Sequence, residues 1–520
     1  MNRTKWIGIV LFNLIISGGF FLSQKNAGYT ALSTDLHNII PVCLKKDHPE
    51  LFQDDLYLNE LTNVQYYTPF FVETLRLIKH TAKTDYLTAL KFLLLITHFI
   101  FGIGWFLLFY KLYKDFWIAL FLSVLIRGII WLPGMEIWGI SELWTMMPRT
   151  LYGALLPYPF VLFDSAHKKR MYVAAFLTGF IFNFHPITGL GGILIYISIG
   201  FWLSIWKKIR WQDLIFQTLF ILLGMTPFIH NYFSHTPVYV DNAVFNEALF
   251  TRIPGYFSDP VAFFKRWFRL SLLFFFVPIF ILGIISVRDK RYKKYFWVLT
   301  SVTLALLILP NLSVYVERFI NNTFRTDLRM SFQLLRIQKL AILPGYFTWG
   351  YILLYVKENW KKGSFVIKLS FFVFLFLVSI SKNKIWNGIP FMGDDIFRTI
   401  LPENLPFGTY TKKTPNQFEE MLQYIENNTP ENALFVGPAI IRSSTRRSVW
   451  WDGKGASMLI EGNPERFVWW YKVKIALDTM DNKKKWEFFK KNGVDYWLTK
   501  DSLPYDVLYR KNEWKLYQLK

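Results

Sequence analysis

Three carboxylates after the first apolar run are the residues of this sequence best suited to catalysis. Asp35 lies shortly beyond that run, in Thr34-Asp35-Leu36-His37, and Asp54 and Asp55 follow it. A carboxylate held in a partly dry site can act as a general base on an acceptor hydroxyl. The same acids could instead hold a divalent cation, the only cofactor that the sequence suggests. Each acid taken singly also fits a solvated loop position or a helix cap, but the group as a whole favours a catalytic site.

Arginines within or beside apolar stretches form a second group. Ionisable residues inside a membrane are costly and usually face a cavity or a partner. Because a guanidinium matches phosphate oxygens with two parallel hydrogen bonds, such arginines suit a lipid-linked phosphate. The predicted phosphate ligands are Arg127, Arg149, Arg329 and Arg336. The arginines that flank a later apolar run are interpreted instead as snorkelling to lipid headgroups, namely Arg252, Arg266 and Arg269.

His185 is a further substrate-binding candidate, since it precedes Pro186 inside an apolar stretch. A histidine in such a place can relay protons or can be a hydrogen-bonded packing residue, and both interpretations stay open. The proline disfavours helix in the residue before it, so the sequence predicts a break between two helices here.

The elements that carry these residues are membrane helices. The chain has 520 residues, of which 53% are hydrophobic and 18% charged, whereas a soluble protein carries about 25% charged residues. Apolar runs of spanning length predict an α-helical polytopic membrane protein with about eleven transmembrane helices. These runs lie near 6–23, 86–110, 115–133, 148–164, 171–185, 187–206, 213–230, 269–287, 295–311, 332–356 and 364–381.

The basic residues indicate the orientation of the chain. The formal net charge is +22, but Lys and Arg sit in short clusters between apolar runs, which is typical of membrane topology and not of nucleic-acid binding. With eleven spans, six such clusters fall on one side, which the positive-inside rule makes cytoplasmic. The sequence therefore predicts a multi-pass protein of the cell (plasma or inner) membrane, with a cytoplasmic N-terminus and an extracytoplasmic C-terminal domain. The single cysteine, Cys43, excludes an intramolecular disulfide.

Four long segments fall on the opposite side, namely 24–85, 231–268, 312–331 and the tail from about 382 to 520. We expect a transmembrane domain over 1–381, including an outer loop at 24–85, and a small extracytoplasmic α/β domain over 382–520. Amphipathic patterns in the loop, around Leu36 and Phe70, predict short helices. In the tail, alternating helical and strand patterns predict the α/β class. These patterns comprise a helix opening at Thr414-Pro415, a strand over 433–436, a helix closed by Asn492-Gly493, and strands over 494–498 and within 507–519.

This layout resembles the GT-C class of polyprenol-dependent membrane glycosyltransferases. The residues that carry the resemblance are Asp35-Leu36-His37-x-x-Ile40-Pro41, Pro49-x-Leu51-Phe52-x-x-Asp55, and a tail with Asn428-Thr429-Pro430, Leu434-Phe435-Val436, Arg446-Arg447-Ser448-Val449 and Lys454. They are similar to a bacterial family of uncharacterised GT-C-like proteins. The resemblance implies a catalytic carboxylate in the first outer loop, where Asp35 lies, with Asp54 and Asp55 as further candidates.

Two departures limit what is carried over. The adjacent Asp-Glu pair typical of protein mannosyltransferases is missing after the first apolar run. Trp450-Trp451-Asp452 is similar to an oligosaccharyltransferase motif, but Gly453-Lys454 does not continue the pattern, and we interpret it as coincidence.

The expected function is transfer of a sugar from a polyprenyl-phosphate donor to an envelope acceptor, a glycan or a protein, on the outer face. The expected partners are this lipid-linked sugar and membrane lipids, and a nucleic acid is not among them. The alternatives are a lipid or glycan transporter (flippase), which would be built from inverted repeats, and a non-catalytic membrane scaffold.

Overall fold

The computed structural model describes most of the chain, and two compact units emerge from it. The described residues are 2–127, 130–132, 136–138, 140, 142–234, 240–253, 255, 259–267, 273–324, 331–380 and 416–520. The helical unit comprises residues 1–24, 94–230 and 255–410, and the sheet unit comprises residues 25–93, 231–254 and 411–520. The predicted boundary at 381/382 lies outside the described residues.

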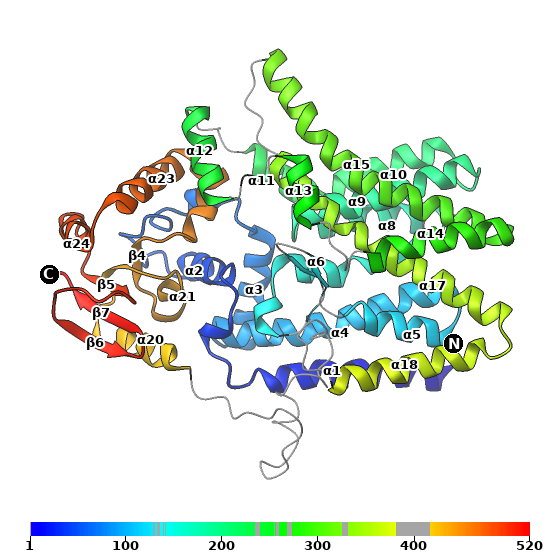
Figure 1. Cartoon of the computed structure of the whole chain (residues 1–520), viewed down its shortest axis with the longest axis horizontal. Helices are drawn as coiled ribbons and strands as arrows, with labels where there is room; N and C mark the ends of the chain where they lie inside the picture. Colours follow the sequence, from blue (N-terminus) through cyan, green and yellow to red (C-terminus); the bar gives the residue numbers. More distant parts are fainter. Residues whose placement is uncertain are drawn as a thin grey trace, which may run out of the picture. The chain divides into compact units, whose positions relative to one another are not determined.

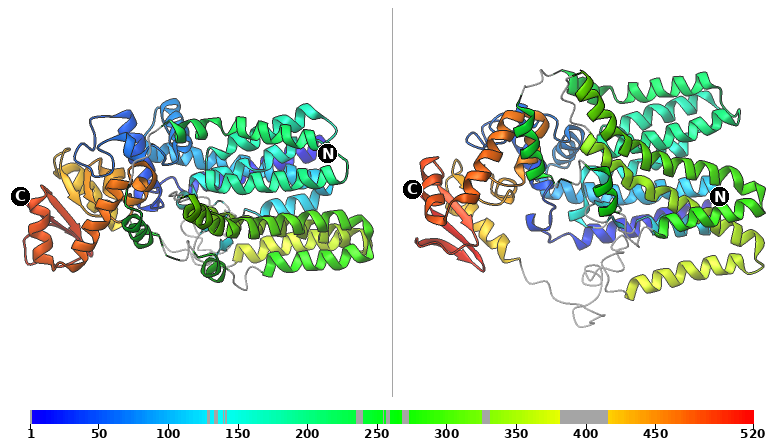
Figure 2. Two further views of the ribbon diagram at one scale, coloured as in Figure 1. Left: turned by 90° about the horizontal axis from the view of Figure 1, so that it is seen from above. Right: turned by 45° about the horizontal axis from the view of Figure 1, so that its top comes forward.

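The helical unit is built from apolar helices, several of them side by side, as α8, α9 and α10 are in Figures 1 and 2. Its helices are α1 (Arg3–Ser23), most of α4 (Tyr86–Tyr113), α5 (Phe116–Leu125), α6 (Pro148–Leu155), α7 (Pro157–Leu162), α8 (Lys168–Phe182), α9 (Pro186–Ile205), α10 (Trp211–Gly224), α11 (Thr226–Phe233), α13 (Pro260–Trp267), α14 (Leu273–Arg288), α15 (Lys293–Phe324), α16 (Ser331–Leu334), η7 (Leu335–Ala341), α17 (Ile342–Asn359) and α18 (Gly363–Ile380). A two-stranded antiparallel ribbon pairs β1 (Ile130–Leu132) with β2 (Glu136–Trp138).

Fewer of these helices are long enough to cross a membrane than the eleven expected from the sequence. Among the described residues, four helices are long and apolar enough, or five if α10 and α11, bent by 57°, count as one span. The difference arises because several apolar runs fold as short or broken helices. The run 148–164 divides into α6 and α7 at Pro157, since a proline removes a backbone donor and clashes with the preceding turn. The predicted break before Pro186 is confirmed by the end of α8 and the start of α9.

The sheet unit contains the predicted C-terminal α/β sheet. Its strands are β3 (Leu434–Val436), β4 (Ser448–Trp451), β5 (Tyr496–Thr499), β6 (Val507–Lys511) and β7 (Trp514–Gln518). They are arranged in the order β4-β3-β5-β7-β6. Strand β3 runs parallel to β4 and β5, while β7 is antiparallel to β5 and β6.

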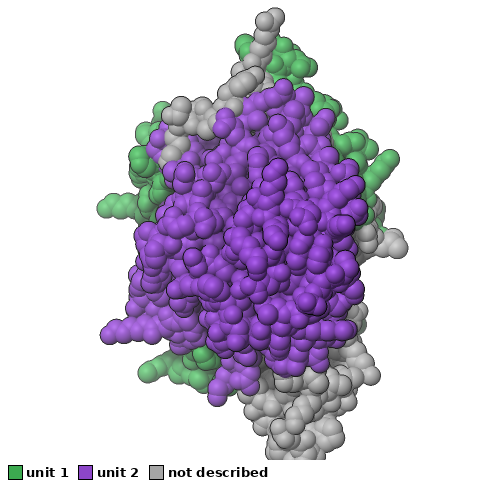
Figure 3. Space-filling model, turned by 90° about the vertical axis from the view of Figure 1, so that its left-hand side faces the viewer, with its two compact units in different colours: residues 1–24, 94–230, 255–410 green, residues 25–93, 231–254, 411–520 purple. Residues whose placement is uncertain are grey.

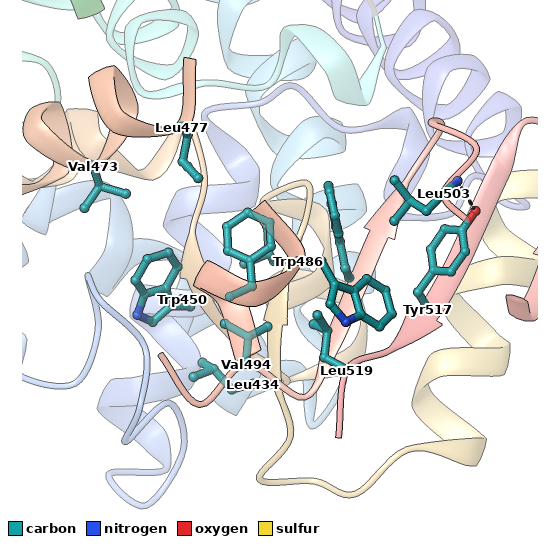
Figure 4. Packing of buried hydrophobic residues seen from close by; sticks show 12 residues of the cluster. Leu434, Trp450, Val473, Leu477, Trp486, Val494, Leu503, Tyr517 and Leu519 are labelled. Carbon is teal, nitrogen blue, oxygen red and sulfur yellow. Dashed lines mark hydrogen bonds between the residues drawn. The ribbon is translucent and has the colours of Figure 1, made fainter. Parts of the chain in front are cut away.

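Helices cover both faces of this sheet because its strands are apolar on both faces. On β3, Leu434 and Val436 pack with α23 (Pro464–Thr479) and α24 (Asn482–Lys491), as Figure 4 shows for Leu434. Phe435, between them, packs on the other face with α20 (Gln417–Asn428) and α21 (Ile440–Thr445). This alternation follows from the two-residue period of a strand. The Tyr517 hydroxyl also accepts a hydrogen bond from the Leu503 amide at 3.0 Å, the dashed line in Figure 4.

The first loop belongs to the same unit as this sheet. It forms η1 (Tyr29–Ala31), α2 (Leu36–Asp47), η2 (Leu61–Val64) and α3 (Pro69–Ala82), so both predicted loop helices are present. The unit is completed by α12 (Asn242–Arg252), η10 (Gly455–Met458) and α22 (Leu459–Gly462). Figure 3 shows the segments of the sheet unit as one continuous surface. Loop and tail, hundreds of residues apart in sequence, therefore belong to one compact unit.

Candidate functional site

A fully buried ion-pair cluster joins the loop to the tail. The guanidinium of Arg442 donates from Nε to Asp55 Oδ2 at 2.5 Å and from Nη1 to Asp452 Oδ2 at 2.6 Å. The side chains of Arg442 and Asp55 have no exposed surface. Burial acts to lower the pKa of Arg442, but the two carboxylates outweigh it and raise that pKa. The guanidinium carbon of Arg442 lies over the Tyr57 ring, 4.5 Å from the ring centroid.

Asp55, which was predicted as catalytic, is a member of this buried cluster. Its Oδ2 also accepts from the Val449 amide at 2.8 Å, and its Oδ1 accepts from the amides of Tyr57 and Leu58 at 2.9 and 3.1 Å. Both oxygens therefore accept hydrogen bonds from internal donors, which gives this carboxylate a structural role. Asp54, its neighbour, is exposed.

Asp452 connects this buried cluster to a lysine. Its Oδ1 accepts from the backbone amides of Lys454 and Gly455 at 2.7 and 2.6 Å. Its backbone also exchanges two hydrogen bonds with the Tyr57 hydroxyl, at 2.7 and 2.9 Å. Burial raises the pKa of Tyr57, so this phenol stays protonated and can donate. Asp452 thus fixes the turn after β4.

Lys454, positioned by this turn, meets the first predicted catalytic residue. Its Nζ lies 2.6 Å from Asp35 Oδ1, and about a third of each side chain is exposed, 31% and 33% respectively. Asp35 occupies the N-cap position of α2 but does not cap that helix with its side chain. Asp35 therefore pairs with Lys454 and does not use its side chain for the usual capping role of an aspartate at this position.

Arg252 approaches the same place from α12. Its Nη2 lies 3.5 Å from the Lys454 carbonyl oxygen, and its Nε is buried with no hydrogen-bond acceptor among the described residues. The phenol of Tyr67 is close by: burial and the charge of Asp35 raise its pKa, and the charge of Arg252 opposes them. Two cations, an acid and a phenol thus converge. From the sequence, Arg252 was interpreted only as a lipid anchor, because the residues around it give no sign of a contact with Lys454.

His37 lies two residues after Asp35 and was not among the predicted site residues. Its Nδ1 is 2.8 Å from Ser443 Oγ, and that hydroxyl donates to the Ile440 carbonyl at 3.0 Å. Burial lowers the pKa of His37 from 6.5 to about 4, which keeps the ring neutral at physiological pH.

A cavity of about 740 Å³ opens beside these residues within the sheet unit. Thr30, Thr34 and His37 of the loop line it, together with Lys454 and Asp452 of the tail. Thr30 is held to the tail by Glu419 Oε1, which accepts from its amide and from its hydroxyl at 2.7 Å each. Loop and tail thus build the cavity together.

The predicted phosphate ligands lie in the helical unit and make separate contacts. Arg127 is buried and donates to Asn13 Oδ1 at 2.5 Å and to the His98 carbonyl at 2.9 Å. Arg336 donates to Gln333 Oε1 at 2.9 Å.

The other predicted ligands of this unit differ in their surroundings. Arg149 contacts the Met147 sulfur at 3.2 Å, and its buried Nε meets no acceptor among the described residues. His185 caps α9, accepting from the Thr188 amide at 3.2 Å, which is the packing role among the two interpretations left open. Arg329 lies outside the described residues.

Within the described part of the chain, no group of three or more His, Cys, Asp or Glu side chains could hold a metal ion. Asp35 and Asp55 in particular pair with different cations, Lys454 and Arg442.

Comparison with protein-family models found no match, and comparison with curated proteins found none either. The apolar helices and the C-terminal α/β sheet define the class as a mostly helical protein, compatible with a multi-pass membrane protein, that carries a small α/β domain. The assignment of an activity rests on the site itself.

Proposed function

We propose that this chain is a GT-C-type membrane glycosyltransferase, which transfers a sugar from a polyprenyl-phosphate donor to an envelope acceptor on the outer face. The observation that carries the proposal is the convergence of Asp35, Lys454 and Arg252 at the surface of the sheet unit. An acid beside two cations is what transfer from a phosphate-linked sugar requires: a proton acceptor for the incoming hydroxyl and counter-charge for the leaving phosphate.

In this mechanism, Asp35 is the general base. The acceptor hydroxyl oxygen attacks the anomeric carbon and passes its proton to the Asp35 carboxylate. The bond from the anomeric carbon to the phosphate oxygen breaks, and the leaving polyprenyl phosphate keeps the electron pair. Attack from the face opposite the phosphate inverts the configuration of that carbon. No nucleotide is needed, because the donor is lipid-linked.

Arg252 holds the departing phosphate, while Lys454 pairs with Asp35 and orients the base. The buried, unsatisfied Nε of Arg252 suits a phosphate oxygen, because a guanidinium donor left without an acceptor is costly and a phosphate supplies one. Arg149 has the same unsatisfied Nε in the helical unit, and we propose it, with Arg127, Arg329 and Arg336, as a phosphate ligand within that unit.

The proposal includes the topology expected from the sequence, with about eleven spans, a cytoplasmic N-terminus and an extracytoplasmic sheet unit. Basic clusters in alternate connections support this orientation. Within the described ranges, four or five helices of full spanning length and three shorter apolar helices support a multi-pass membrane protein.

The test is a comparison of lipid-linked sugars, extracted from cells that lack the protein and from cells that carry single variants, by mass spectrometry. We expect one polyprenyl-linked sugar to accumulate in the deletion strain and with Asp35→Asn, and to stay at the wild-type level with Asp54→Asn. The exposed Asp54 is the matched control, because its substitution removes the same charge from the same loop. An unchanged lipid pool in every strain would overturn the proposal.

A second comparison separates the two roles. Arg252→Met should raise the KM for the lipid donor more than it lowers kcat, because it removes a phosphate contact and leaves the base in place. Asp35→Asn should lower kcat. If both variants affected only KM, Asp35 would be a binding residue and not the base.

A further inference from the structure

The cavity of the sheet unit lies where parallel sheets most often bind ligands. Three groups of lining residues directly follow parallel strands: Gly437, Pro438 and Ala439 after β3, Asp452, Gly453 and Lys454 after β4, and Lys500 and Asp501 after β5. All three strand ends therefore share one edge of the sheet. Ligands of open α/β sheets bind outside the carboxyl ends of strands, at the point where the connections diverge.

The connections diverge between β3 and β5. From β3 the chain passes through α21 to β4, on one side of β3 in the sheet. From β5 it continues to β6 and β7, on the opposite side. The two loops leave in opposite directions and open a crevice between adjacent strand ends, and the first loop of the chain closes it with Thr30, Thr34 and His37.

The lining combines aromatic rings with short polar side chains. The aromatic members are Trp451, Trp514 and Phe418, of which Trp514 and Phe418 stack with ring centroids 4.5 Å apart. The polar members include Thr30, Thr34, Asn416 and Thr499. Aromatic rings offer flat apolar surface to C–H groups, while hydroxyl and amide groups donate and accept hydrogen bonds. A sugar ring presents these two surfaces together.

The two lysines of the lining argue against an anionic ligand. Lys454 pairs with Asp35 at 2.6 Å, and Lys500 pairs with Glu513 at 2.5 Å. Asp452 pairs with the buried Arg442 at 2.6 Å. Each of these charged lining groups already has its counter-ion, so an anionic ligand would have to displace an acid. Hydrogen bonding and ring contact are the interactions that the wall offers.

We propose that this cavity binds an uncharged saccharide, and that this saccharide is the acceptor. The identification as acceptor rests on the proposed function, whereas the binding of a saccharide does not. Lys454 connects the two sites, since its side chain lines the cavity and pairs with the base, Asp35. A sugar hydroxyl in the cavity is thereby brought towards the carboxylate that would take its proton.

The experiment measures binding of neutral trisaccharides of glucose, mannose, galactose and N-acetylglucosamine by isothermal titration calorimetry. The full chain is held in lipid nanodiscs, because sugar-based detergents would compete. We expect at least one trisaccharide to bind the wild type, and Trp514→Ala to weaken it at least tenfold. Trp469→Ala is the matched control, since Trp469 is exposed in the same unit and does not line the cavity. Trp514→Phe keeps a ring on Phe418 and should retain most of the wild-type affinity. It replaces Trp514→Ala in the comparison if that variant does not fold.

The proposal is overturned if no trisaccharide binds the wild type, if inorganic phosphate binds there instead, or if the two tryptophan variants lose affinity equally. The lipid-linked sugar pool of the Trp514→Ala strain separates this inference from the proposed function. Accumulation of the same lipid-linked sugar as with Asp35→Asn supports both. If the saccharide binds but the lipid-linked sugar pool is unchanged in both the Trp514→Ala and the Asp35→Asn strains, the saccharide site is supported and the glycosyltransferase activity is refuted.

Discussion

The buried pair of Asp55 and Arg442 should decide whether the first loop stays joined to the C-terminal sheet. Both side chains are fully buried, so removing the Asp55 charge leaves the Arg442 charge out of solvent with Asp452 as its remaining anion. Breaking a buried pair in this way costs about 3–5 kcal/mol, roughly a hundredfold to several thousandfold in the equilibrium between joined and separated segments. We expect this loss for Asp55→Asn. Arg442→Leu should cost at least as much, because it also leaves Asp452 without its cation.

The assay uses the full chain in lipid nanodiscs, with a specific-protease site inserted after Gly393. After cleavage, the urea concentration that releases half of the C-terminal fragment reports how strongly the fragment is held. We expect it to fall strongly for Asp55→Asn and to stay unchanged for Asp54→Asn, because Asp54 is exposed. Release of the Asp55→Asn fragment at the wild-type urea concentration would refute the structural role of the buried pair.

Three further changes test other parts of the structure. Burial lowers the pKa of His37 to about 4. The unfolded chain binds the proton from pH 6.5 downward, whereas the folded chain does not. The free energy of unfolding should therefore fall by about 3 kcal/mol between pH 6.5 and 4. His37→Asn should remove this part of the pH dependence of thermal unfolding, and identical pH profiles would contradict the assignment. A Cβ at Gly462 would overlap the Asn63 carbonyl oxygen, while Gly453 has open space around it. Gly462→Ala should therefore lower the free energy of unfolding in urea by about 1–3 kcal/mol, and Gly453→Ala much less. Equal losses would contradict the close approach of Gly462 to Asn63. Arg127→Leu removes three buried hydrogen bonds and should destabilise the helical unit by about 1–3 kcal/mol in thermal unfolding, whereas an unchanged midpoint would show that these bonds contribute nothing.

Local patterns predicted the elements of the tail well. The strand predicted over 433–436 is β3, and the helix closed by Asn492-Gly493 is α24, where Gly493 takes a positive φ of 77°. Turn residues and strand periodicity act over a few neighbours, so a sequence reveals them directly. The predicted helix opening at Thr414-Pro415 lies at the edge of the described residues, which resume at Asn416, the N-cap of α20.

The apolar helices were predicted less well, because an apolar run says little about where a helix breaks. Hydropathy does not distinguish one long helix from two short ones, and α10 and α11 bend by 57° within a single predicted span. A proline such as Pro157 marks some of these breaks. Others depend on packing between helices that a single sequence does not reveal.

The candidate site could be predicted only in part. Asp35 was identified by its place in the first loop, and the structure puts it beside Lys454. Asp55 was predicted as catalytic on the same grounds but is buried against Arg442, a partner almost four hundred positions away. Pairings over such separations leave no local pattern, which is also why Arg252 was interpreted as a lipid anchor.

The central claim is that Asp35 serves transfer from a lipid-linked sugar, and the most direct measurement follows the donor itself. Purified protein in lipid nanodiscs is mixed with the lipid extract of the deletion strain, and the accumulated polyprenyl-linked sugar is followed by mass spectrometry. The account predicts that wild type and Asp54→Asn convert it to free polyprenyl phosphate when an acceptor saccharide is present, and that Asp35→Asn does not. Persistence of the donor with the wild type, or equal conversion by Asp35→Asn, would contradict the account.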